Sequence, residues 1–159
     1  MDRQTAVEPR GFVVTNDPVV SKPDYFVEHR IGRLVVTRLC SMRDVHAVDY
    51  VRRMMTNTLL IHGPAVLCAD WEHIEIFSPP VSEAVISMLT VTNSKIVSSG
   101  ILLAPQAATF NLQAERVIRD ANNPSRKAFR DRRKLLDWFV GFLQPDEMQA
   151  VSEFLRCKP

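Results

Sequence analysis

This 159-residue chain contains few of the patterns by which enzymes are usually recognised. Its four histidines stand singly, its three cysteines form no CxxC pair, and its five glycines form no phosphate-binding loop. Ser98-Ser99-Gly100 lacks the glycine spacing of a nucleophile elbow. We therefore predict no catalytic residue, no metal and no cofactor, and keep an enzyme of unrecognised type only as an alternative.

Long apolar runs are also missing. No stretch approaches the roughly 18 apolar residues that a membrane span requires, and the N-terminus has no apolar signal-peptide core. The odd number of cysteines argues against a disulfide framework, and the apolar surroundings of Cys40 and Cys68 predict small buried side chains. We expect a cytoplasmic protein without a membrane span.

The charge is small in total but uneven along the chain. The net charge of +2 predicts neither a nucleic-acid nor a membrane partner. Residues 116–134, however, hold eight cations and two aspartates, a charge of +6, which leaves −4 for the remainder of the chain. Such asymmetry can steer an acidic partner towards one part of the surface.

The first 24 residues differ in pattern from those that follow. They contain Pro9, Pro18 and Pro23 and few apolar positions, which predicts a flexible leader over residues 1–24. Two β-prone runs follow at 25–30 and 34–39, and Gly32 between them predicts a hairpin with positive φ.

Helical and strand-like patterns alternate after the hairpin. We expect Ser41 and Asp44 to cap a helix that ends near Ile61. The apolar runs 65–69 and 97–104 predict strands that are covered on both faces. Together with the helices between and after them, they predict a single α/β domain at residues 25–143 with a mixed, mostly parallel sheet of four to five strands and flanking helices. Residues 144–159 are expected to form a C-terminal amphipathic helix.

The chain resembles the SpoIIAA-like branch of the STAS superfamily, also described as STAS/SEC14-like. The resemblance rests on the hairpin, the strand 66–70 with its terminal Asp70, the loop 76–80 and the tail 127–139 with its closing aromatic pair. It implies a regulatory module, without enzymatic activity, that docks to a partner protein. The SEC14-like label implies an alternative, a domain that binds a small ligand or a lipid.

Better-known STAS proteins are switched by phosphorylation of a serine at the start of the helix that follows the acidic-ended strand. The resemblance therefore implies Ser78 or Ser82 as a phosphoacceptor, although the Asp-Ser-Ser-Gly pattern of those proteins is absent. The residues themselves also allow a simpler role, in which Ser78 only caps the helix.

Two surfaces are candidates for partner binding. Loops at the carboxyl ends of parallel strands form binding sites in α/β folds, and aromatic residues among charges suit an interaction rim. Trp71 and Phe77 can alternatively pack into the core. This rim consists of Asp70, Trp71, Glu72, His73 and Phe77.

The second candidate, called the basic face here, consists of Arg116, Arg119, Arg126, Lys127, Arg130, Arg132, Arg133 and Lys134. The alternative is a solvated surface laced with ion pairs. Nucleic acid is an unlikely partner, because no aromatic residues alternate with these cations. We expect a protein partner, with a homodimer as one form of it, and we expect Trp138 to be substantially buried in the last helix of the domain.

Overall fold

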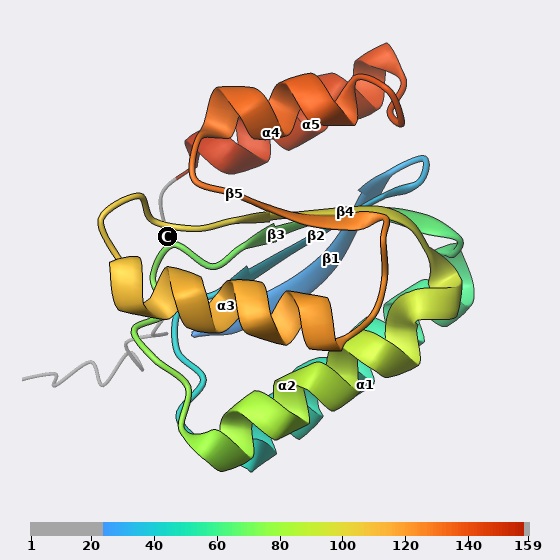
Figure 1. The fold of residues 1–159 in the computed structure, drawn as a ribbon. Coiled ribbons are helices and arrows are strands. Elements are labelled where there is room, and N and C mark those ends of the chain that lie inside the picture. The colour runs from blue at the N-terminus through green and yellow to red at the C-terminus, as the bar shows by residue number, and fades with distance from the viewer. Residues whose placement is uncertain (1–23, 158–159) are drawn as a thin grey trace, which may run out of the picture.

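The computed structural model describes residues 24–157 as one α/β unit (Figure 1). The predicted leader lies outside the described residues except for Asp24. The strands are β1 (Tyr25–Ile31), β2 (Leu34–Leu39), β3 (Ala65–Asp70), β4 (Ile96–Leu102) and β5 (Arg126–Phe129). The helices are α1 (Val45–His62), α2 (Pro79–Thr92), α3 (Ala108–Asp120), α4 (Arg132–Phe139) and α5 (Pro145–Arg156), and the short 3₁₀ turn Asn93–Lys95 joins α2 to β4.

The five strands form one mixed sheet in the order β1-β2-β3-β4-β5. Strand β1 is antiparallel to β2, and the other neighbours are parallel. The predicted strands 34–39, 65–69 and 97–104 therefore correspond to the three central strands β2, β3 and β4. Every residue of β2 and β3 is buried because helices cover both faces of the sheet. Gly32 joins β1 to β2 with a φ of 54°, the positive value expected for this turn.

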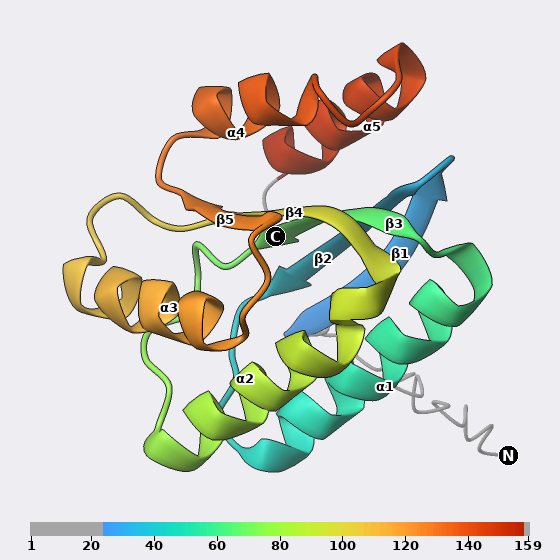
Figure 2. The same cartoon turned by 45° about the vertical axis from the view of Figure 1, so that its right-hand side comes forward.

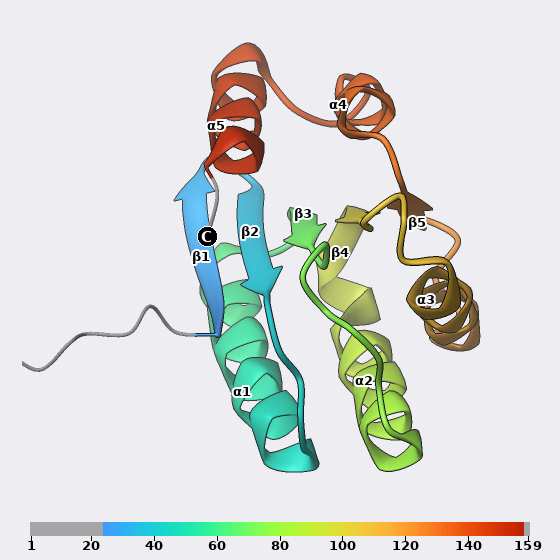
Figure 3. The same ribbon diagram turned by 90° about the vertical axis from the view of Figure 1, so that its left-hand side faces the viewer.

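The helices form two unequal layers. Each crossover from β2 to β5 moves one strand further in the same direction, so the connecting helices α1, α2 and α3 share one face of the sheet (Figures 1 and 2). On the opposite face α5 covers β1 and β2, while α4 covers β4 and β5 (Figure 3). Strand β5 remains at the edge of the sheet, between α3 and α4.

Helix α1 follows the predicted apolar spacing but not the predicted cap. Its N-cap is Asp44, whose carboxylate accepts the N–H of Ala47 at 2.9 Å, so Ser41 is not the capping residue. The helix ends where the N–H of Gly63 reaches the carbonyl oxygen of Leu59 at 2.8 Å. The side chains that face the sheet are Val48, Val51, Met55 and Leu59.

Helix α5 packs against the sheet and belongs to its core. Phe154 packs edge-to-face against Phe26 of β1, with ring centroids 6.1 Å apart, and Val151 is fully buried. In α4, Leu135 and Phe139 are fully buried against the glycine of β4, Gly100. Trp138 keeps a minor part of its surface exposed and packs against the same cluster, so the expectation that it is substantially buried is confirmed. Among the described helices, none combines the length and apolar character needed to cross a membrane.

Candidate functional site

The carboxyl edge of the sheet contains a buried ion pair. Arg38 and Asp70 are paired in register at the ends of β2 and β3, and Nε of Arg38 donates to Oδ2 of Asp70 at 2.8 Å. The other carboxylate oxygen accepts the N–H of Glu72 at 3.1 Å. Asp70, predicted as an interaction residue, is instead buried inside the edge of the sheet.

The same arginine ties the last helix to the sheet. Nη2 of Arg38 donates to the carbonyl oxygens of Phe154 and Cys157 at 3.1 and 2.7 Å, and the guanidinium lies 4.7 Å from the centroid of the Phe154 ring. These carbonyls belong to the final turn of α5, which has no helical N–H partners for them. Arg38 thus satisfies the end of α5 and neutralises Asp70.

Trp71 and Phe77 are core residues and not exposed anchors. Only 1% of the surface of Trp71 and 2% of that of Phe77 is exposed to solvent. Their rings meet edge-to-face at 5.9 Å, and Phe77 meets Phe110 of α3 in the same way at 5.2 Å. The alternative that both side chains fold back into the core is therefore confirmed.

A glutamine on α3 holds this loop in place. Gln113 accepts the N–H of Phe77 at 2.8 Å and donates to the carbonyl oxygen of the same residue at 2.7 Å. Of the remaining rim residues, Glu72 forms an ion pair with Arg132 at 2.7 Å and His73 is exposed. Ile76, which the sequence did not single out, is 59% exposed beside an open depression of about 530 Å³.

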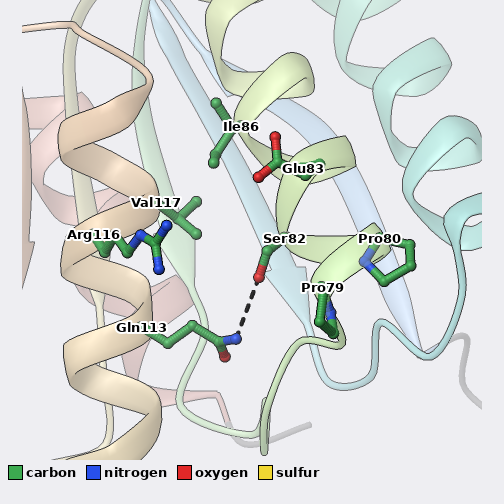
Figure 4. Close-up of a pocket in the computed structure, with 8 residues that line it drawn as sticks. All are labelled: Pro79, Pro80, Ser82, Glu83, Ile86, Gln113, Arg116 and Val117. Atoms are coloured by element: carbon green, nitrogen blue, oxygen red, sulfur yellow. Dashed lines mark hydrogen bonds between the residues drawn. The ribbon is translucent and has the colours of Figure 1, made fainter.

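The two candidate serines have different environments. Ser78 occupies the N-cap position of α2, but its hydroxyl accepts no backbone hydrogen bond, so side-chain capping is not what the structure shows. The first two helical residues, Pro79 and Pro80, have no N–H to offer to that hydroxyl or to a phosphate. Ser82 lies in an open groove of about 400 Å³ between α2 and α3, where its oxygen accepts a hydrogen bond from Gln113 at 3.2 Å (Figure 4). Arg116 lines the same groove.

Seven members of the basic face are exposed, and one is not. Arg126 retains only 4% exposure, so its assignment to a surface was wrong. Side chains alternate along a strand, and the inward position of Arg126 in β5 leaves the next residue, Lys127, exposed. Burial lowers the pKa of Arg126 to about 10.

The exposed cations differ in their partners. Arg130 pairs with Glu115 at 2.6 Å, while Arg116 and Arg119 each lie 3.6 Å from Asp120. Within residues 24–157, no carboxylate forms an ion pair with Lys127, Arg133 or Lys134. Arg119 and Lys127 line the groove beside β5, Arg130 directly follows this strand, and Arg133 and Lys134 lie in the first turn of α4. We call these five exposed cations the basic edge.

An aromatic cluster and a groove flank the basic edge. The ammonium of Lys127 lies 5.8 Å from the ring centroid of Trp138, which also packs against Phe129 at 5.4 Å. On the other side of β5, an open groove of about 550 Å³ separates this strand from α3, and its lining includes Ile118 and Ala128. The edge therefore offers apolar contacts as well as positive charge.

Nucleophilic and metal chemistry receive no support from the described residues. Burial raises the pKa of the Cys68 thiol well above its ordinary value, and burial together with the charge of Asp70 raises that of Cys40. No cluster of three or more metal-ligating side chains occurs in the part of the chain that the structure describes.

No protein-family model, no characterised protein and no solved structure matches this chain.

Proposed function

We propose that this protein is a non-enzymatic docking module, of the regulatory kind that its STAS-like sequence features imply, and that it binds an acidic segment of a partner protein at the basic edge. The observation that carries the proposal is the position of β5. It is an edge strand, and the neighbouring Lys127, Arg133 and Lys134 have no ion-pair partner within residues 24–157.

The backbone of β5 supports binding by strand addition. The carbonyl oxygens of Ser125 and Phe129 accept hydrogen bonds at 2.9 and 2.8 Å from the N–H groups of Ser99 in β4 and of Leu103 directly after it. Successive residues of a strand direct their backbone N–H and C=O groups to opposite sides. Because Phe129 faces β4, the N–H and C=O of Ala128 point away from β4. An extended peptide that pairs with these groups would become a sixth strand, and its alternate side chains would enter the groove beside Ile118.

Charge complementarity indicates the kind of peptide. Residues 116–134 carry +6 and the rest of the chain carries −4. An acidic segment would be attracted to the basic edge, and an unpaired lysine or arginine gains most from such a contact. The edge cations at the same time discourage unspecific pairing with neutral strands.

The loop 70–77 is a weaker candidate for the docking surface. Its two aromatic side chains are in the core, and two of its three carboxylates, Asp70 and Glu72, pair with Arg38 and Arg132. Ile76 is the one large apolar side chain that this loop leaves mostly exposed. A single isoleucine is common on protein surfaces and does not define an interface.

The alternative of a small-ligand or lipid-binding domain has no specific observation in its favour. The three large depressions are open to solvent, and the enclosed cavity beneath β3 and β4 measures about 10 Å³, far below the roughly 300 Å³ of a small-molecule site. We place the docking module in the cytoplasm, in keeping with its free cysteines.

The proposal can be tested with defined peptides. A fluorescent peptide of alternating glutamate and valine should bind, and the matching lysine-valine peptide should not. The triple variant Lys127→Glu, Arg133→Glu and Lys134→Glu should lose this binding. The control variant Arg43→Glu, Arg53→Glu and Lys95→Glu makes the same charge change at exposed sites outside the basic edge and should retain it.

Fluorescence anisotropy at two salt concentrations measures the binding, which should weaken as salt rises. Equal binding by the two triple variants would refute the basic edge as the docking surface. Sedimentation of the free protein tests whether the acidic partner is a second copy of this chain. In that case the unchanged protein and the control variant should self-associate, and the variant of Lys127, Arg133 and Lys134 should not.

A further inference from the structure

We propose that the outer edge of β1 is a self-association surface, at which two copies of this chain pair as antiparallel strands about a twofold axis at Val27. The two border strands of the sheet are β1 and β5, so this surface lies opposite the basic edge. The proposal does not rest on the docking function proposed for β5.

The first argument is the open and apolar character of β1. Among the described residues no strand pairs with its outer side, and Figure 3 shows it as the border of the sheet between α1 and α5. It spans seven residues, contains neither lysine nor proline, and keeps a regular register with β2 as far as His29. Tyr25, Phe26 and Val27 stay partly exposed. Tyr25 also packs at 5.6 Å against Tyr50 of α1, which is 55% exposed. Natural sheets normally protect such an edge, because it favours pairing with another strand.

The second argument is the direction of the β1 backbone. The N–H of Cys40 donates to the carbonyl oxygen of Asp24 at 2.7 Å, so Asp24 faces β2. Because this direction alternates along a strand, the N–H and C=O of Tyr25, Val27 and His29 point away from β2. With the axis at Val27, this residue meets its own copy and Tyr25 meets His29 of the second copy. Every outward residue of the regular segment then belongs to a pair that exchanges hydrogen bonds in both directions. An axis at His29 would leave only one such pair, because the register with β2 shifts directly after it.

The third argument is the charge along the same register. Exposed Asp24 lies opposite Arg30 of the second copy, and the long arginine side chain can span the strand spacing of about 4.8 Å. An axis at Phe26 would instead place Asp24 opposite Glu28. An axis at Glu28 would place two copies of this carboxylate opposite each other. Like charges that face each other across strands are destabilising, so both the charges and the backbone favour the axis at Val27.

The pairing has a consequence for the whole assembly. It would join two five-stranded sheets into one continuous sheet with a basic edge at each end. Two such edges would bind a partner with two acidic segments more tightly than one edge does, and only this consequence rests on the proposed docking function.

Sedimentation of the whole protein over a range of concentrations measures the dimer. Asp24→Arg should weaken it at least about tenfold, because both ion pairs become pairs of like charges. The double variant Asp24→Arg and Arg30→Asp restores opposite charges and should return the dissociation constant to within about threefold of that of the unchanged protein. Asp137→Arg makes the first charge change at an exposed site of α4 and should have no effect. Thermal unfolding verifies that each variant is folded.

Amide hydrogen exchange, followed by NMR, tests the backbone pairing directly. The N–H groups of Tyr25, Val27 and His29 should be protected in the dimer and lose this protection on dilution. The N–H groups of Phe26 and Glu28 face β2, so their protection should not change with concentration.

Several outcomes would overturn the proposal. These are a protein that stays monomeric at the concentrations used for NMR, a dimer that Asp24→Arg leaves unchanged, and a charge exchange that does not restore association. Protection of the outward amides that is independent of concentration would also overturn it, because the edge would then be covered within one molecule, for example by residues 1–23. A dimer that the variant of Lys127, Arg133 and Lys134 loses would belong to the basic edge and would overturn it as well.

Discussion

Arg38 and Asp70 face each other at the ends of neighbouring parallel strands, and their ion pair, 2.8 Å from Nε to Oδ2, is almost completely buried. The pair joins three parts of the chain, because Arg38 also reaches the final carbonyls of α5 and Asp70 fixes the start of the following loop. The geometry of the carboxyl edge therefore depends on a salt bridge between residues 32 positions apart in sequence.

Breaking this ion pair should cost much more than a surface substitution. Asp70→Asn leaves the Arg38 guanidinium buried without a counter-charge, and we expect a loss of about 3–5 kcal/mol in the free energy of unfolding. Urea denaturation measures the loss. Glu28→Gln breaks an exposed ion pair with Arg30 and serves as the control, with an expected change below about 1 kcal/mol. Similar losses in both variants would contradict a structural role of the buried pair.

The layered fold was largely predictable from the sequence, whereas the burial of the residues proposed as an interaction rim was not. Apolar runs and helical spacing are local properties of the sequence, and they correctly indicated the three central strands and the buried face of α1. The burial of Phe77 depends instead on Gln113, a residue 36 positions away that holds the backbone of the loop. Such a contact leaves no local pattern.

The positions of neighbouring residues explain the error at Arg126 and the difference between Trp138 and Phe139. Arg126 was grouped with the cations around it, but strand alternation directs it inward and Lys127 outward. Trp138 immediately precedes Phe139 in a helix, and a step of about 100° places the tryptophan at the margin of the buried stripe, where it is substantially but not fully buried. An arginine inside the apolar run 34–39 was the sequence signal that could have revealed Arg38 as the partner of Asp70.

Asp44 and Ser78, the N-cap residues of α1 and α2, provide a test of helix capping. Asp44→Ala should cost about 1 kcal/mol of unfolding free energy, because its carboxylate accepts the N–H of Ala47. Ser78→Ala should stay within about 0.5 kcal/mol, because the hydroxyl caps nothing. Denaturant unfolding compares the two variants. A larger loss for Ser78→Ala than for Asp44→Ala would contradict the arrangement seen at the start of α2.

The adjacent aromatic residues of α4 should differ in their contribution to stability. Phe139 is fully buried, so Phe139→Ala should cost about 3–5 kcal/mol. Trp138 is not fully buried and loses less contact on truncation, and Trp138→Ala should be clearly less destabilising in the same denaturation experiment. Equal losses would show that the tryptophan contributes as much to the core as Phe139 does.

Thiol reactivity should separate the three free cysteines. A raised pKa keeps a thiol protonated to higher pH, so Cys68 and Cys40 should have little reactive thiolate at pH 8, and Cys68 is also inaccessible. Iodoacetamide treatment followed by mass spectrometry should label exposed Cys157 first. Unfolding in urea should bring the other two to the same extent of labelling. Rapid native labelling of Cys68 would contradict its burial.

Strand addition at β5 can be separated from simple charge attraction by one backbone substitution. Ala128→Pro removes an N–H that points away from β4, so the existing ladder of the sheet keeps its hydrogen bonds, and proline is tolerated on an edge strand in this orientation. The variant retains every cation of the basic edge but cannot donate to an added strand.

We expect the glutamate-valine peptide to bind the Ala128→Pro variant at least about tenfold more weakly, because a lost intermolecular hydrogen bond and a steric clash at the edge together exceed about 1.4 kcal/mol. Ala128→Ser keeps the N–H and should bind as the unchanged protein does, and thermal unfolding of both variants verifies that the sheet is intact. Unchanged peptide affinity in a folded Ala128→Pro variant would leave the charges as the binding determinant and exclude pairing with β5.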